Sequence, residues 1–157
     1  MKKLFCVLFI ASLAVLSCHK KKINDKLSLI GTYSGRSEVH SSQLQEIFTS
    51  PGVSHFEWLS DSVFIDPDEL MVQNLSDDSF ELSGPVAMQW PDYWRRISWK
   101  EVQNTDTAFV LMKNLSSPGY FSEDLKVVFS PDGQFVSANY HHTDTHSNKT
   151  VEFDGSK

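Results

Sequence analysis

The chain has 157 residues, of which 40% are hydrophobic and 22% are charged, and its formal net charge at pH 7 is −6. A chain of this length suits one domain that buries an adequate core without disulfides or a structural metal. The acidic balance excludes a nucleic-acid-binding protein, because phosphate recognition needs a basic surface.

Residues 1–17 have the three parts of a secretory signal peptide. Two lysines precede an apolar run from Leu4 to Leu16, and the small residue Ser17 follows it. The run is shorter than the ~20 apolar residues that a helix needs to span a bilayer. We therefore expect this segment to be cleaved on export.

The four residues from Val15 to Cys18 resemble a bacterial lipobox, with an aliphatic residue three positions before the cysteine and a small residue directly before it. The resemblance implies that Cys18 is lipidated and becomes the first residue of the mature chain. Several acyl chains anchor a protein far more firmly than a single one. Cys6 lies inside the signal peptide, so no disulfide is expected in the mature protein.

Residues 18–28 are polar and mostly basic, which predicts a flexible tether. In lipoproteins of the Bacteroidetes type, which this chain resembles, acidic residues after the cysteine direct export to the outer face. The basic residues found here favour a lipid anchor on the periplasmic face of the outer membrane. Loss of the two signal-peptide lysines leaves 12 basic against 20 acidic residues, a net charge of −8.

Residues 29–157 alternate between apolar and polar positions, with turn residues at short intervals, as expected for a single antiparallel all-β domain. Asp66–Asp68 and Ser76–Asp78 are expected turns. Leu44, Ile47 and Phe48 have helical spacing, so residues 41–52 predict either a short helix or a loop. Strands are expected over residues 29–40, 56–65, 69–75, 79–83, 93–102, 107–113, 125–130, 134–141 and 150–153.

The hairpin over residues 125–140 is the clearest local prediction. Leu125, Val127 and Phe129 alternate on one face, and the return strand alternates in the same way after the turn from Ser130 to Gly133. Glycine adopts a positive φ without steric cost, as a bulged hairpin loop requires. We therefore expect Gly133 to have a positive φ.

Short connections between the expected strands predict an up-and-down meander. Closing such a sheet into a barrel removes its exposed edges, so a barrel of about eight strands is the leading fold and a β-sandwich is the alternative. The first strand, at Gly31–Gly35, resembles the start of small lipocalin-like lipoproteins, with Tyr33 in place of their tryptophan. The closing residues 151–157 also resemble the last strand of many Bacteroidetes lipoproteins of this size. These resemblances imply a barrel that can enclose a ligand cavity.

Aromatic residues concentrate just before and within the expected strand over residues 93–102, next to Arg95 and Arg96. Aromatic rings beside arginine can stack on sugars or line an apolar pocket, and the simpler interpretation is packing in the core or at its rim. The candidate ligand-binding aromatics are Trp90, Tyr93, Trp94 and Trp99.

His141, His142 and His146 form the densest group of potential metal ligands, where a strand is expected to enter a turn. An ordinary polar loop is the favoured interpretation, so we expect no metal and no other cofactor. The sequence has neither a nucleophile elbow nor a glycine-rich phosphate loop. We therefore expect no enzymatic activity.

The leading functional hypothesis is a non-catalytic binding module, attached to the membrane through Cys18, for a small apolar or glycan ligand. The alternative is an interaction lipoprotein with a filled barrel that contacts another envelope protein. Large inward side chains fill a barrel and small ones leave a cavity. Eleven phenylalanines and four tryptophans favour a filled interior.

Overall fold

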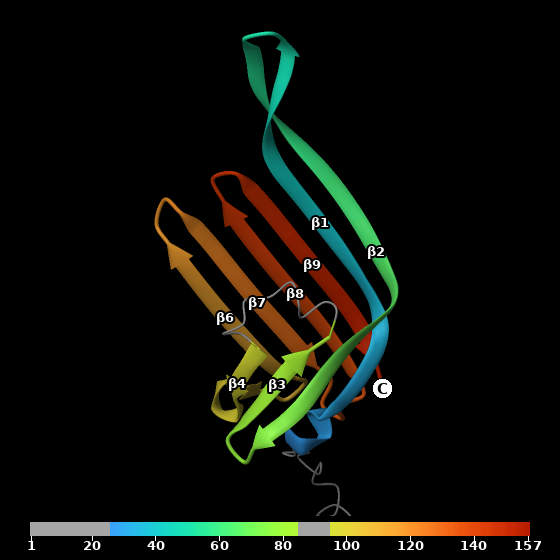
Figure 1. Ribbon diagram of the computed structural model, residues 1–157. Helices are drawn as coiled ribbons and strands as arrows, with labels where there is room; N and C mark the ends of the chain where they lie inside the picture. Colours follow the sequence, from blue (N-terminus) through green and yellow to red (C-terminus); the bar gives the residue numbers. More distant parts are fainter. Residues whose placement is uncertain (1–25, 85–94) are drawn as a thin grey trace, which may run out of the picture.

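The computed structural model describes residues 26–84 and 95–157, and all its strands belong to one antiparallel sheet that curls into a half-barrel (Figure 1). The expected all-β class is confirmed, and the described strands do not form the two sheets of a sandwich. A short 3-10 turn, η1 (Lys26–Leu29), precedes the sheet. The strands are β1 (Gly31–Ser50), β2 (Val53–Ser76), β3 (Ser79–Ser83), β4 (Arg96–Ser98), β5 (Gln103–Asn104), β6 (Phe109–Ser117), β7 (Phe121–Phe129), β8 (Phe135–Asp144) and β9 (Ser147–Ser156).

The strand order β4-β3-β2-β1-β9-β8-β7-β6-β5 is that of a meander whose first and last strands pair with each other. Its two ends, β4 and β5, are joined by the 3-10 turn η3 (Trp99–Glu101). Ser98 caps this turn, and the Glu101 carboxylate accepts a hydrogen bond from the Ser98 backbone N–H in return. The chain itself therefore links the two edges of the half-barrel, at one end only.

The core lies on the concave face of the sheet, where alternate residues of most strands point inward. Phe80 and Trp99 stack with ring centroids 4.2 Å apart. Burying an aromatic or branched aliphatic side chain stabilises a fold by about 1.5–3 kcal/mol. The largest fully buried side chains are Tyr33, Phe80, Phe109, Phe129, Phe153, Leu29, Leu70, Leu82, Ile97, Leu111, Leu125 and Val72.

One end of the half-barrel, which we call the base, holds η1, the β7–β8 turn and the C-terminal residue (Figure 1). The buried Tyr33 hydroxyl donates to the carbonyls of Leu29, at 2.9 Å, and Gly133, at 3.0 Å. Burial raises the pKa of Tyr33, so the phenol stays a hydrogen-bond donor. The Lys157 ammonium donates to two carbonyls of residues 28–30 and lies 4.8 Å from the centre of the Tyr33 ring. These contacts fix the first described residues at the base.

The expected helix or loop over residues 41–52 is wrong. β1 continues to Ser50, turns at Pro51–Gly52 and returns as β2, antiparallel to β1, with a register shift between Phe48 and Ser50 next to the turn. Gly52 has a φ of 80°, as the second central residue of a type II turn after proline requires. Pairing along the whole length of β2 outweighs the local helical spacing.

The expected turn at Asp66–Asp68 is also wrong, because β2 runs through it as one strand of 24 residues. The register shifts between Gly35 and Ser37, so Arg36 lies opposite the extra residues of β2. This is a β-bulge, which accommodates Pro67 and bends the strand without ending it.

The remaining differences concern strand ends. The strand expected over residues 93–102 is a strand only at Arg96–Ser98 before η3, and its first two residues lie outside the described part of the chain. The strand expected over residues 107–113 begins at Phe109 and ends at Ser117, and the last three strands are longer than predicted. The strand over residues 79–83 and the turn with a positive φ at Gly133, 69°, are confirmed.

Two glycine substitutions test the packing of the base. Gly119 and Gly133 both have a positive φ, but a Cβ at Gly119 meets nothing within 4 Å, whereas at Gly133 it would lie 2.3 Å from the Ser28 carbonyl oxygen. We expect Gly119→Ala to cost about 1 kcal/mol from backbone strain alone. Gly133→Ala should lower the melting temperature by several degrees more. Equal losses in thermal unfolding would contradict the described contact between η1 and the β7–β8 turn.

Candidate interaction surface

The β1–β2 hairpin extends well beyond the rest of the sheet (Figure 1). β9 pairs with β1 only from Ser34 to Gln43, and a hydrogen bond of 2.8 Å from the Leu44 N–H to the His146 carbonyl is the last backbone contact there. On the other side, β3 pairs with β2 only from Met71 onward. The hairpin from Leu44 to Leu59 is therefore a two-stranded ribbon, which we call the arm.

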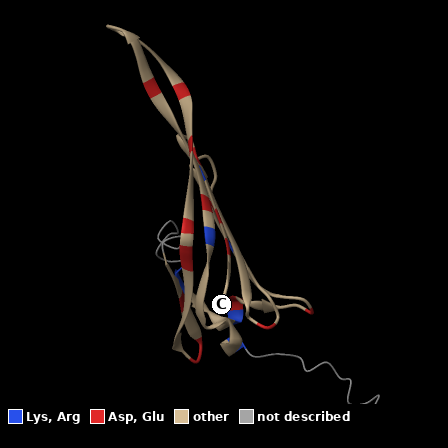
Figure 2. Cartoon of the chain, turned by 90° about the vertical axis from the view of Figure 1, so that its right-hand side faces the viewer, with Lys and Arg blue, Asp and Glu red and all other residues tan. Residues whose placement is uncertain are grey.

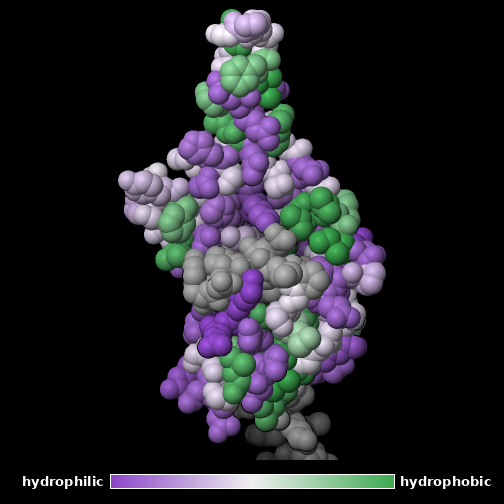
Figure 3. Space-filling view, viewed as in Figure 1, coloured by the Kyte–Doolittle hydropathy of each residue, from purple (hydrophilic) through white to green (hydrophobic). Residues whose placement is uncertain are grey.

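One face of the arm displays apolar side chains to solvent. The strand register places Leu44 opposite Trp58, Glu46 opposite Phe56 and Phe48 opposite Ser54, so all six side chains share this face. Phe48 is 70% exposed, Phe56 65% and Trp58 49%. Figure 3 shows apolar surface on the projecting part of the molecule. We call Leu44, Phe48, Phe56 and Trp58 the apolar stripe.

The stripe is large enough to form the centre of a binding site. An aromatic side chain buries about 150–250 Å² when fully covered, so the exposed parts of the three rings offer on the order of 350 Å². Contiguous apolar patches of several hundred Å² on soluble proteins mark interaction sites. A specific protein interface buries about 800 Å² per partner, of which such a patch would be the apolar core.

The opposite face of the arm is more polar. Gln43 pairs with Leu59, Gln45 with Glu57 and Ile47 with His55 across this face. The His55 imidazole lies 3.8 Å from the Glu57 carboxylate. The apolar stripe is therefore a property of one face and gives the arm a matched control surface.

The arm itself has no lysine or arginine, and in the neighbouring strand β9 Lys149 lies opposite Ser41, just before the arm begins. No lysine or arginine stands between Arg36 and Arg95 in the sequence, whereas Glu38, Glu46, Glu57 and Asp61 lie on or beside the arm. Figure 2 shows the acidic residues along this hairpin. The arm thus combines exposed aromatic rings with carboxylates and has no lysine or arginine of its own.

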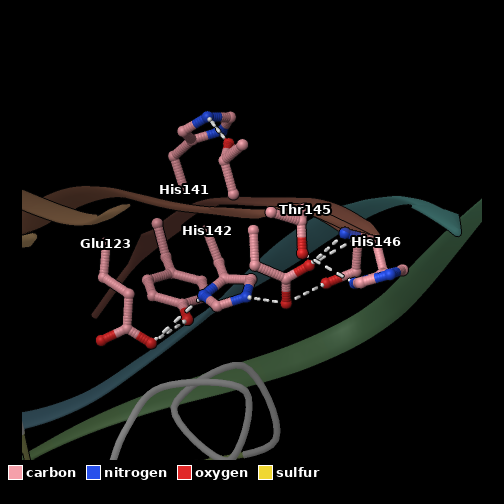
Figure 4. A network of polar contacts seen from close by, with 9 residues as sticks. Glu123, His141, His142, Thr145 and His146 are labelled. Carbon is pink, nitrogen blue, oxygen red and sulfur yellow. Dashed lines mark hydrogen bonds and ion pairs between the residues drawn. The ribbon is translucent and has the colours of Figure 1, made fainter. Parts of the chain in front are cut away.

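The histidine group lies where β8 and β9 meet at the end opposite the base (Figure 4). The His142 imidazole lies between two carboxylates, with Nδ1 3.2 Å from Glu123 and Nε2 3.2 Å from Asp144. His141 bonds two threonine hydroxyls, and the His146 ring contacts Thr145. The three rings therefore do not face a common point.

Asp144 organises the turn into β9. Its carboxylate accepts hydrogen bonds from the backbone N–H groups of His146 and Ser147 and from the Ser147 hydroxyl. The His146 N–H, followed by the Ser147 hydroxyl and His142, holds the pKa of Asp144 well below its usual range. The carboxylate lies between the serine and the histidine, so the imidazole is not placed to activate the hydroxyl. Among the described residues, no three His, Cys, Asp or Glu side chains are placed to hold a metal ion.

Of the candidate ligand-binding aromatics, only Trp99 falls within the described part of the chain. It is 7% exposed, and its indole N–H donates to the Asn74 side chain at 3.1 Å. Trp99 therefore packs in the core. Trp90, Tyr93 and Trp94, like the lipidation candidate Cys18, lie outside the described residues.

A shallow groove of about 870 Å³ crosses β8, β9 and β1. Phe135, 62% exposed, lines it together with Arg36, Asp154 and several serines. Such a mixture of an aromatic ring, hydroxyls and one guanidinium can contact a small polar ligand. It is the second candidate site on the described surface.

The sequence does not predict the arm as a hairpin, because a helix or loop is expected over residues 41–52, although a strand is expected over residues 56–65. Two signals in the sequence indicate it: the Pro51–Gly52 pair between two apolar-polar segments, and the alternation of Phe56 and Trp58 with polar residues.

No protein-family model, no curated protein and no solved structure matches this chain. Among the described residues, no helix has the length and apolar character needed to cross a membrane.

A zinc titration tests the interpretation of the histidine turn. A ligand at a hundred times its dissociation constant stabilises the native state by ~2.7 kcal/mol, which is several degrees for a domain of this size. We expect equimolar zinc to leave the melting temperature nearly unchanged, because the three rings do not converge. A rise of several degrees that the double substitution His142→Ala and His146→Ala abolishes would make this turn a metal site.

Proposed function

We propose that this protein is a lipid-anchored envelope protein that binds another protein through the arm. The observation that carries the proposal is the exposure of the apolar stripe on a ribbon beyond the rest of the sheet. Exposing aromatic rings to water is unfavourable, and a partner that covers them recovers the free energy of burial.

The packed interior supports an interaction protein over a carrier of apolar ligands. Tyr33, Phe80, Phe109, Phe129 and Phe153 are each at most 1% exposed on the concave face. Large side chains directed inward fill a barrel of this size. The apolar contact area available to a partner is therefore on the arm.

The positions of the two ends fit a protein presented away from a membrane. Lys26 donates to the Val102 carbonyl at 3.1 Å, at the base, and the arm extends from the opposite end of the sheet. With the lipid on Cys18, the mature tether before Lys26 has about eight residues and spans at most ~28 Å. An anchor near the base then directs the arm away from the bilayer that holds the protein.

A small-molecule or glycan ligand is the second candidate function, and the groove lined by Phe135 and Arg36 supports it. Nearly half of the lining residues come from the paired segments Ser34–Arg36 of β1 and Asp154–Ser156 of β9. The groove is open to solvent on the sheet surface. It therefore suits a ligand of which only one edge contacts the protein.

Photo-crosslinking in the producing cells tests the proposal. We expect benzoylphenylalanine at position 56 to form a covalent adduct with a protein in the membrane fraction. Tyr120, which is 75% exposed on the β6–β7 turn, is the control position and should give no adduct. Cys18→Ala should release the protein from the membrane fraction and reduce the adduct. Equal labelling at both positions, or retention of the Cys18→Ala protein in washed membranes, would overturn the proposal.

A further inference from the structure

We infer that the partner of the arm presents a cationic side chain, arginine or lysine, within an apolar groove, and that Glu46 receives it. This inference rests on the proposed interaction function and adds the chemistry of the partner. It follows from the position of Glu46 within the apolar stripe and from the lack of lysine and arginine on the arm itself.

Glu46 occupies the middle of the stripe. It stands between Leu44 and Phe48 along β1 and directly opposite Phe56 on β2. The Ser54 hydroxyl donates a hydrogen bond to its carboxylate, which directs the carboxylate across the same face. Any surface that covers the aromatic rings therefore also covers Glu46.

Covering this carboxylate restricts the chemistry of the partner. A buried carboxylate is costly unless it is paired and hydrogen-bonded, and one serine hydroxyl satisfies only part of its accepting capacity. A guanidinium or ammonium group supplies both the charge and the donors. Arginine and aromatic side chains are enriched at the energetic centres of protein interfaces.

The charge around the stripe favours a basic partner over a neutral one. The 37–94 segment contains no lysine or arginine, so no such residue of the arm neutralises Glu46, and the basic residue of β9, Lys149, lies opposite Ser41, outside the arm. Complementary charge at the rim of an interface steers association and excludes partners of the same sign.

A lipid bilayer fits this face poorly. Membrane-binding surfaces place lysine and arginine beside their apolar side chains, because envelope lipids are commonly anionic. Here Glu46 would enter the bilayer with Phe56, its cross-strand neighbour. Both effects oppose insertion of the stripe.

A second copy of the chain and the chain's own segments also fit poorly. Two arms placed face to face would bring two Glu46 carboxylates together without a cation. Ser83, at the end of β3, pairs with Met71, which stands 15 residues along β2 from Phe56, or ~50 Å of strand. The ten residues 85–94, which follow in the sequence, span at most ~35 Å, which is too short to reach the stripe.

Selection from displayed random peptides tests the inference with a defined probe. The bait is the soluble chain that begins at His19. We expect enriched peptides to combine arginine or lysine with apolar residues, and a synthetic peptide of their consensus to bind in fluorescence anisotropy. Glu46→Lys and Phe56→Ser should each weaken this binding at least tenfold, and Glu46→Gln should weaken it by a smaller factor.

Matched controls lie on the opposite face of the same arm. Glu57→Lys makes the same charge change there and Leu59→Ser removes another exposed apolar side chain, and each should leave binding within about threefold of the parent protein. Thermal melting of all five variants, followed by circular dichroism, verifies that they fold. We expect melting temperatures close to that of the parent protein, because none of the substituted residues belongs to the core.

The inference would be overturned if no peptides were enriched, or if the enriched peptides lacked basic residues. Peptide binding that Glu46→Lys does not weaken would also overturn it. So would stripe-dependent binding of the protein to vesicles of phosphatidylethanolamine and phosphatidylglycerol. Dimers in sedimentation that Phe56→Ser abolishes would identify a second copy as the occupant and also overturn it. If adducts still form at position 56 in cells, the interaction function stands and only the cationic partner is wrong.

Discussion

The pairing of β1 with two strands of unequal length is the constraint on which the rest of the structure depends. β1 pairs with β2 along nearly its whole length, whereas β9 covers only Ser34–Gln43. Where both partners are present, the sheet continues on each side of β1 and curls around a core. Where β9 ends, β1 keeps one partner, and the hairpin continues as a ribbon that neither face of the sheet covers. β1 therefore contributes both to the curled sheet around the core and to the arm.

The curled sheet and the arm are stabilised by different interactions. The curled sheet buries a continuous set of aromatic and aliphatic side chains, and hydrogen bonds from Tyr33 and Lys157 attach η1 to the base. A two-stranded hairpin alone is at best marginally stable in water. The arm depends on the attached sheet for its order, and a partner that covers the stripe would add to its stability. The stripe is therefore a place where substitutions change binding more than folding.

The sequence indicates the strand class well because alternation is a local signal. The meander order and the β7–β8 hairpin with Gly133 followed from alternation and turn residues. The length of β1 and β2 could not be predicted in the same way. Leu44, Ile47 and Phe48 fit a helix as well as a strand, and only pairing with residues of β2 decides between them. Proline is typical of turns, so Pro67 predicts one. A β-bulge opposite Arg36 accommodates it within the strand instead, and that bulge depends on how β1 and β2 pair. The stripe was missed for the same reason, since its two halves become one face only when the hairpin forms.

A distance measurement between two spin labels tests most directly whether the arm projects from the sheet. The chain that begins at His19 contains no cysteine, so Val53→Cys and Glu69→Cys place one label next to the tip and one near the bulge of β2. About 16 residues of extended strand separate them, and we predict a distance distribution centred near ~50 Å. A flexible chain of this length would give a broad distribution around ~25 Å. A distribution below about 30 Å would contradict a projecting arm and, with it, the proposed interaction surface.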